Sequence, residues 1–408
     1  MAISLAIIIL LGIISNYIFE KLKLPGLLGM LITGIIIGPY TLNLIDPSLL
    51  NISGDLRKIA LIVILLRAGL GINRSELKAI GKPALKMSCI PGILEGLSIA
   101  FAAKYILGFS FVQGGILGFI IAAVSPAVVV PQMLELMDKK IGTNKNIPTL
   151  ILASASIDDV FAITIMTTFM GLYGGNNINI AGKIIGIPIS ILLGILLGFL
   201  IGLLLTVLFK HINLNNGKKV LIVLASSIIL NYLEVTLENV VSIASLLGVM
   251  TIGFILMDKS PKVSKEISKG FNKIWIFAEI LLFVLVGAQV NIAVAIKAGL
   301  SGIVVILIGL IFRSIGVTIS LINTNLSLKE KLFCVISYIP KATVQAAMGV
   351  ASGDIILSIS VLSIIITAPL GALGIKLSSN ILLSKSNDDE NYYSKEKISW
   401  LLYNIGLV

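Results

Sequence analysis

Residues 147–173 read IPTLILASASIDDVFAITIMTTFMGLY, an apolar stretch long enough to cross a bilayer, with two adjacent aspartates near its middle. An α-helix needs roughly 20 apolar residues to span the hydrocarbon. A charge at that depth costs at least about 2.5–3.5 kcal/mol, so an ionisable residue there indicates function. The stretch therefore predicts a transmembrane helix that carries part of a functional site.

The composition extends this interpretation to the whole chain. Hydrophobic residues make up 57% of the 408 residues and charged residues only 12%, with a mean hydropathy of +1.06, whereas soluble domains carry about 25% charged residues. We predict an all-α polytopic membrane protein with about 13 transmembrane helices. Their approximate bounds are residues 2–19, 26–45, 56–71, 84–107, 112–136, 147–173, 180–209, 218–237, 240–257, 274–291, 299–323, 331–351 and 355–379.

The basic residues predict the orientation. The formal net charge is +11, but the lysines and arginines lie mostly in short loops between apolar runs, which argues against nucleic acid as a partner. One set of alternate loops carries most of them, whereas the other set holds only Arg57, Lys58, Lys183 and Lys297. Because basic loops stay in the cytoplasm, we expect the N-terminus outside, the tail of residues 378–408 in the cytoplasm, and the inner cell membrane as the location.

Asp158 and Asp159 are the strongest candidates for an ion-binding site. Successive residues of a helix point about 100° apart, so one carboxylate can line an ion path while the other meets a partner helix. A buried carboxylate can hold either a proton or a cation, and this competition is the chemistry of exchange. The alternative is a pair neutralised by Arg or Lys for packing alone, but two adjacent acids exceed what packing requires.

Two further stretches predict discontinuous helices. Residues 123–131 read AVSPAVVVP, with Pro126 and Pro131 inside an apolar run, and residues 338–343 read YIPKAT, with Pro340 and Lys341. Proline in a helix interior removes a backbone donor and disturbs the preceding turn. Irregular backbone at membrane depth is tolerated where it lines a cavity or is buried in protein. The alternative for each helix alone is a simple proline kink.

The positions of these features fit an inverted repeat of six helices on each side of a linker helix. The two broken spans are seven apart, so they cross the membrane in opposite directions, as in many secondary transporters. Glu95 and Arg313 lie on spans that are also seven apart, which predicts an ion pair between the repeats that is either functional or purely structural. Lys341 either neutralises helix ends at its break or reaches the cytoplasmic interface.

Several segments together resemble a known family. These segments are Leu24–Met30 with Gly34 and Gly38-Pro39, Leu66–Gly71, Pro91 with Glu95, Ala123–Pro131 and Pro340–Ala347. The first of them resembles the early helix of the monovalent cation:proton antiporter superfamily, and the others are closest to the NHA-type sodium/proton exchangers.

The resemblance implies an antiporter that forms a homodimer in the lipid membrane. Residues 1–377 would form the transmembrane domain, in which core helices (about 84–173 and 299–379) move as an elevator against dimerisation or scaffold helices (about 1–71 and 180–291). Asp159 would be the main carrier of cation and proton, Asp158 would assist, and Ser125 would complete the cation shell. Arg313 paired with Glu95 resembles the NHA pattern.

We therefore expect a non-enzymatic secondary antiporter that exchanges Na⁺ or Li⁺ for H⁺, with no resident cofactor, because the metal at Asp159 and Asp158 would be the transported ion. Carboxylate and carbonyl oxygens suit hard cations, and the chain shows no P-loop for ATP. The alternatives are a K⁺/H⁺ antiporter of the same fold and a passive cation channel. An intramembrane aspartyl protease is disfavoured, because it needs carboxylates that face each other.

Overall fold

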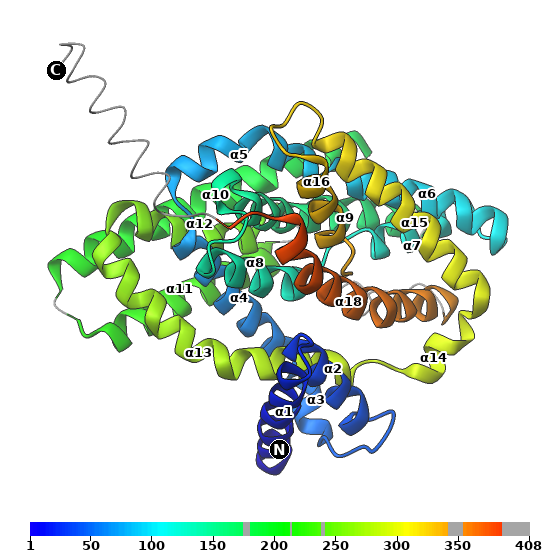
Figure 1. Ribbon diagram of the computed structural model, residues 1–408, viewed down its shortest axis with the longest axis horizontal. Helices are drawn as coiled ribbons and strands as arrows, with labels where there is room; N and C mark the ends of the chain where they lie inside the picture. The colour runs from blue at the N-terminus through cyan, green and yellow to red at the C-terminus, as the bar shows by residue number, and fades with distance from the viewer. Residues whose placement is uncertain (174–179, 213, 238–240, 342–353, 386–408) are drawn as a thin grey trace.

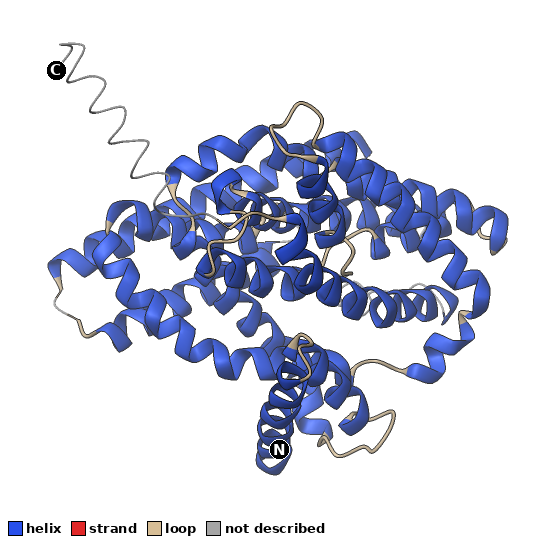
Figure 2. Cartoon of the chain, viewed as in Figure 1, coloured by secondary structure: helices blue, strands red, loops and turns tan. Residues whose placement is uncertain are grey.

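The computed structural model describes residues 1–173, 180–212, 214–237, 241–341 and 354–385. These residues are helical almost throughout (Figure 2). Among them the backbone pairs as β-structure only at two isolated bridges, Val124 with Lys341 and Ile141 with Lys385. The predicted all-α class is confirmed. The predictions for residues 342–353 and for most of the tail fall outside the described residues.

The helices, in chain order, are α1 (Ala2–Lys21), α2 (Gly26–Ile37), α3 (Pro47–Asn51), α4 (Ser53–Gly71), α5 (Arg74–Met87), α6 (Ile90–Ile106), α7 (Phe111–Ile121), α8 (Pro126–Asp138), the short η1 (Thr143–Lys145), α9 (Ile147–Tyr173), α10 (Ile180–His211), α11 (Asn216–Leu237), α12 (Ser245–Lys259), α13 (Pro261–Ala288), α14 (Ile292–Lys297), α15 (Gly299–Ser320), α16 (Leu328–Ser337) and α18 (Asp354–Leu382). By length and composition, eight helical segments among the described residues could cross a membrane. Two shorter apolar helices, α2 and α7, accompany them. The count of about 13 spans stays a prediction.

Helix bounds differ from the prediction where charged residues were assigned to loops. Residues 72–83 were predicted to be a loop, and most of them lie in α5. Residues 261–273 likewise form the first half of α13. In that half, Ile267 and Phe271 are buried whereas Lys262 and Lys269 face outward. This is the pattern of an amphipathic helix at a surface, so the lysines lie on a helix rather than in a loop.

Two predicted helices are shorter than expected because small residues and proline end them. The span predicted at 26–45 ends at Ile37, where Gly38 is extended and Pro39 follows. The span predicted at 84–107 is divided between α5 and α6 at Ser88 and Cys89, two residues before Pro91. Proline disfavours helical backbone in the residue before it, which fits the extended Gly38. Pro91 instead lies in the first turn of α6, where proline is well accommodated.

Helices of the described part of the chain lie in two outer sets with further helices between them (Figure 1). In Figure 1, α6, α7 and α15 lie together at the right, α11 and α12 lie at the left, and α8, α9 and α16 lie between them. Contacts are extensive between α6 and its neighbours α7 and α15, between α12 and its neighbours α4 and α10, and between α2 and α13. Small residues permit this packing, as expected inside a membrane. A Cβ at Gly118 would lie 2.1 Å from the Gly96 carbonyl oxygen, and one at Gly69 would lie 2.0 Å from the Met250 carbonyl oxygen.

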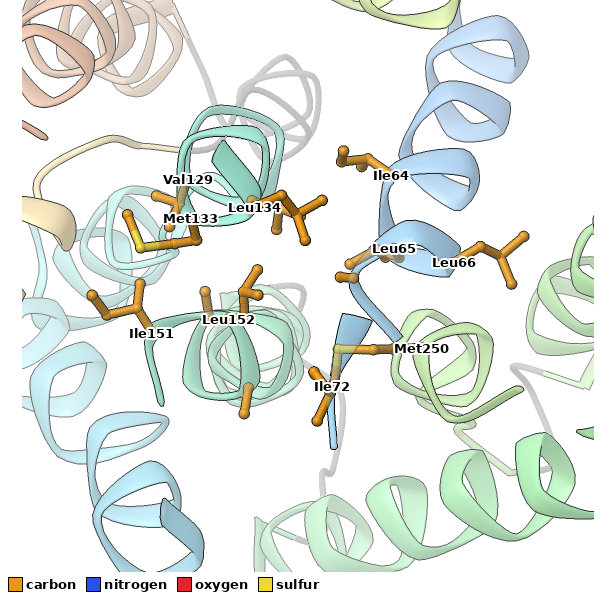
Figure 3. Close-up of a cluster of buried hydrophobic side chains, with 14 of the residues drawn as sticks. Ile64, Leu65, Leu66, Ile72, Val129, Met133, Leu134, Ile151, Leu152 and Met250 are labelled. Atoms are coloured by element: carbon orange, nitrogen blue, oxygen red, sulfur yellow. The ribbon is translucent and has the colours of Figure 1, made fainter. Parts of the chain in front are cut away.

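An apolar contact joins α8 and α9 to α4 and α12. Figure 3 shows this contact, in which Leu134 of α8 points toward Ile64 of α4, while Val129 and Met133 of α8 lie on the side of Ile151 of α9. Val129, Met133 and Leu134 come from α8, whereas Leu65 comes from α4 and Met250 from α12. Close packing of apolar side chains stabilises the contact between the helices through many weak dispersion interactions. The helix that carries the two aspartates thus rests on an apolar surface of its neighbours.

Candidate functional site

The first break in a helix lies between α7 and α8. Residues 122–125 separate the two helices, and Pro126 occupies the first turn of α8, where its missing N–H would have no helical partner. Pro131 lies inside α8, which continues through it to Asp138. Of the two prolines that predicted a discontinuous helix, only Pro126 therefore adjoins the break. Ser125 is 3% exposed and precedes the helix with extended backbone.

The second break follows α16 and meets the first. The Ser125 N–H donates to the Pro340 carbonyl oxygen at 2.9 Å, and Val124 pairs with Lys341 in an antiparallel bridge. Backbone groups freed by one broken helix are thus satisfied by the other, as an interior without water requires. The remainder of this segment, from Ala342, lies outside the described residues.

Helices α6 and α15 bring two further charged residues to this point. Pro91 and Glu95 lie one turn apart on α6, and Gly309, Arg313 and Gly316 share one face of α15 at helical spacing. A Cβ at Gly316 would lie 2.6 Å from Pro91 Cα, and one at Gly309 would lie 3.4 Å from Glu95 Cγ. The two glycines therefore let α15 approach α6 closely enough for Arg313 to reach Glu95.

A buried ion network occupies the crossing. Arg313 Nη1 lies 2.5 Å from Glu95 Oε2, and Arg313 Nη2 lies 3.3 Å from Asp158 Oδ2. The Lys341 ammonium donates to both carboxylate oxygens of Glu95. All four side chains are at most 2% exposed. With every group ionised, two positive charges match two negative charges, which is the condition under which buried ions are tolerated.

Backbone groups of the first break complete the network. The Ala122 carbonyl accepts a hydrogen bond from Arg313, and the Val124 N–H donates to Asp158 Oδ2 at 2.9 Å. The roles of Ala122 and Val124 could not be predicted from their side chains, because apolar residues carry no signal for main-chain chemistry. The signal that could have found them was Pro126, which places a helix start immediately downstream and so leaves the preceding groups without helical partners.

The two aspartates have different surroundings. Asp158 is 1% exposed, and its Oδ1 makes no hydrogen bond within the described part of the chain. A Cβ at Gly92 would lie 3.3 Å from this oxygen, so the glycine leaves room beside it. Asp159 is half-buried. The pair therefore combines one carboxylate held inside the network with a neighbouring residue that is more exposed overall but whose Oδ1 is also buried.

The structure brings Glu95, Asp158, Arg313 and Lys341 into direct contact and places Ser125 beside them through its backbone. Lys341 lies on a carboxylate and not at the cytoplasmic interface, so its alternative placement does not fit. Asp159 follows Asp158 on α9. Within the described residues no group of three or more His, Cys, Asp and Glu side chains is placed to hold a metal. Carboxylate and carbonyl oxygens near the crossing are the ligands that this region offers to a hard cation.

Two broken helices that meet around a buried, charge-balanced network define a polytopic membrane protein of the secondary-transporter class. The chain belongs to the sodium/hydrogen exchanger family, because the family model described as "Sodium/hydrogen exchanger, transmembrane" matches residues 5–378. The predicted superfamily is confirmed.

Relatives and a solved structure support this assignment. The chain is 32% identical to sodium/hydrogen exchanger 9B2 of Homo sapiens over 406 residues, which cover 92% of this chain and 73% of that protein. It is 30% identical to sodium/hydrogen exchanger 9B1 of Homo sapiens over 411 residues, which cover 94% and 79%. The sodium proton antiporter MjNhaP1 from Methanocaldococcus jannaschii has a similar fold, with a TM-score of 0.71 and 22% identity over 93% of this chain and 94% of that one.

Proposed function

We propose that this chain is a secondary antiporter that exchanges Na⁺ for H⁺ across a membrane. Membership of the sodium/hydrogen exchanger family and 32% identity to sodium/hydrogen exchanger 9B2 over 92% of the chain support this function. The observation that carries the proposal is the buried network at the two helix breaks. The network is charge-balanced and includes Asp158, and the neighbouring Asp159 can hold one proton or one cation at a time.

Within this function, Asp159 carries the cation and the proton in turn, and Asp158 assists. Asp158 Oδ2 is already engaged by the Val124 N–H and by Arg313. The Asp159 residue is more exposed than Asp158, although its Oδ1 is buried, so exchange of ions with water requires the site to open. Ser125 and carbonyl oxygens of the first break supply further ligands of the type that hard cations prefer. A proton and a cation then compete for one carboxylate.

The movement that exposes the site alternately is an elevator, in which α8 and α9 slide against α4 and α12. The mostly apolar contact of Figure 3 supports this proposal, because apolar surfaces can move past one another at low cost, and the hydrogen bond from Ser156 to the Met250 sulfur is a weak one. The same proposal includes a homodimer in the cell membrane, with the N-terminus outside and the C-terminal tail in the cytoplasm, as the loop charges indicate. The proposal includes Li⁺ as a second cation that is exchanged for H⁺.

The test uses proteoliposomes that contain a pH-sensitive dye and a preformed proton gradient. Na⁺, Li⁺ and K⁺ are added in turn to wild type, to Asp159→Asn and to Asp55→Asn, a control in an exposed helix start. We expect a Na⁺ response in wild type and in the control and none above background in Asp159→Asn. A full response in Asp159→Asn contradicts the role of that residue, and a response to K⁺ alone changes the substrate.

A further inference from the structure

The second helix break leaves one main-chain donor without a partner in its own helix. Helix α16 ends at Ser337, and Pro340 has no N–H to donate. The N–H of Lys341 is therefore the first main-chain donor after the proline. This N–H is buried, and it donates at 3.1 Å to the hydroxyl oxygen of Thr367 on α18. A buried N–H without a partner is costly in an interior that holds no water.

Helix α18 supports the same break a second time. Gly371 lies four residues after Thr367 and therefore on the same face of α18. A Cβ at Gly371 would lie 2.3 Å from Pro340 Cγ and 2.5 Å from its Cδ, so only glycine lets the proline ring rest on the helix. Thr367 and Gly371 together form the surface on which Pro340 and Lys341 lie.

These two residues of the break are the ones that organise the ion network. The Lys341 ammonium donates to Glu95, which also binds Arg313. The Pro340 carbonyl accepts the N–H of Ser125 at the first break. A displacement of Pro340 and Lys341 therefore moves the ammonium relative to Glu95 and shifts the backbone that precedes α8.

The contact of Thr367 differs from those of most threonines in the described helices, although Thr149 on α9 also reaches another helix, where it donates to Glu76. Thr206 and Thr251 donate to carbonyl oxygens one turn earlier in their own helices, an arrangement that needs no partner elsewhere. Thr367 accepts a hydrogen bond from a segment 26 residues earlier and is fully buried. The fold thus places its hydroxyl where it accepts the hydrogen bond of a main-chain N–H at the second break.

We propose that Thr367 is a positioning residue for ion exchange, which holds the Lys341 backbone so that the Lys341 ammonium stays on Glu95. Thr367 touches neither ion and acts through Lys341. This inference rests on the proposed Na⁺/H⁺ exchange, and it adds a residue of α18 to a site otherwise built from α6, α9, α15 and the two breaks.

The test compares Thr367→Val with Thr367→Ser. Valine keeps the shape but removes the hydroxyl, whereas serine keeps the hydroxyl. Thr251→Val, which removes a hydroxyl that bonds only its own helix, is the matched control. The apparent KM for Na⁺ and the maximal rate are measured in proteoliposomes and normalised to folded protein. We expect Thr367→Val to raise the apparent KM about tenfold, and the serine variant and the control to stay within about twofold of wild type.

The outcomes for the positioning role of Thr367 and for the proposed Na⁺/H⁺ exchange are distinguishable. An unchanged KM in folded Thr367→Val, or a KM raised equally in Thr367→Ser, overturns the positioning role. Wild type without a Na⁺ response overturns the proposed function instead. If Thr367→Val does not fold, Gly371→Ala provides the second test, because it keeps the hydroxyl and displaces Pro340. A raised KM in that variant supports the coupling of α18 to the site, and an unchanged KM overturns it.

Discussion

Two arginines lie inside apolar stretches of this chain, and they are satisfied in different ways. Arg313 on α15 is 2% exposed and binds Glu95, Asp158 and the Ala122 carbonyl. Arg67 on α4 is only half-buried. Its Nε donates to the Asn272 side chain at 2.7 Å, and its guanidinium lies 5.6 Å from the ring centre of Trp275.

The difference shows what full burial demands of a guanidinium. Both arginines lie over an aromatic ring, since Arg313 also lies 5.2 Å from the ring centre of Tyr338. Arg67 has a ring, an amide and the more distant charges of Glu279 and Asp138, and water still solvates part of its charge, so no direct ion pair is needed. Arg313 has lost that water, so it requires ionised partners and a carbonyl. We therefore expect the cost of losing the side chain to depend on the partners left behind.

The largest effect is expected for Arg313→Met. Removal of the guanidinium leaves Glu95 with Lys341 alone and Asp158 with only a main-chain donor, and breaking a buried ion pair costs about 3–5 kcal/mol of the free energy of unfolding. Thermal melting in detergent and Na⁺-dependent proton flux measure stability and activity. We expect a large loss of stability and no exchange.

The neighbouring variant Ser314→Ala is the control, because Ser314 donates only to the Leu310 carbonyl in its own helix. The double variant Glu95→Gln with Arg313→Gln removes one negative and one positive charge together. If the ion pair is what the single variant breaks, the double variant is more stable than the sum of the two single losses predicts. Additive losses would show that the pair has no coupling energy.

Much of the fold could be predicted from the sequence, because apolar length and charge depth are strong signals. The stretch 147–173 was predicted with the bounds that α9 has. Prediction was wrong where polar residues were assigned to loops, as in the first half of α13. There a lysine every three or four residues faces outward while the other face of the helix is buried. An amphipathic helix and a basic loop have similar composition, and only the spacing distinguishes them.

The candidate site could be predicted in part. Repeat spacing paired Glu95 with Arg313, and the structure places the two charged groups 2.5 Å apart. The glycines at positions 309 and 316, on the face of Arg313, were a further signal of close helix approach. Thr367 could not be found in this way. A threonine in an apolar helix usually bonds its own backbone, so its contact with Lys341 depends on the tertiary arrangement alone.

An intermediate effect is expected for Lys341→Met. The variant removes one of the two cations on Glu95 and leaves Arg313 in place, so Glu95 keeps a charged partner. A hydrogen bond to a charged group contributes about 1.5–3 kcal/mol, which is the loss in unfolding free energy that we expect. Chemical or thermal unfolding measures it, with the exposed Lys329→Met at the start of α16 as the control. A loss as large as that of Arg313→Met would mean that the two cations act as one unit.

The smallest effect is expected for Arg67→Gln. Glutamine can still donate to Asn272, but Glu279 loses the nearby charge of Arg67. Because water reaches the half-exposed position and solvates part of the charge left behind, we expect a loss of about 1 kcal/mol, smaller than that of Arg313→Met. Arg67→Lys keeps the charge without the planar group and separates the two contributions. Both variants are measured by melting in detergent beside Arg313→Met. A destabilisation of Arg67→Gln as large as that of Arg313→Met would contradict the dependence on burial, because water would then not compensate the guanidinium at the half-exposed position.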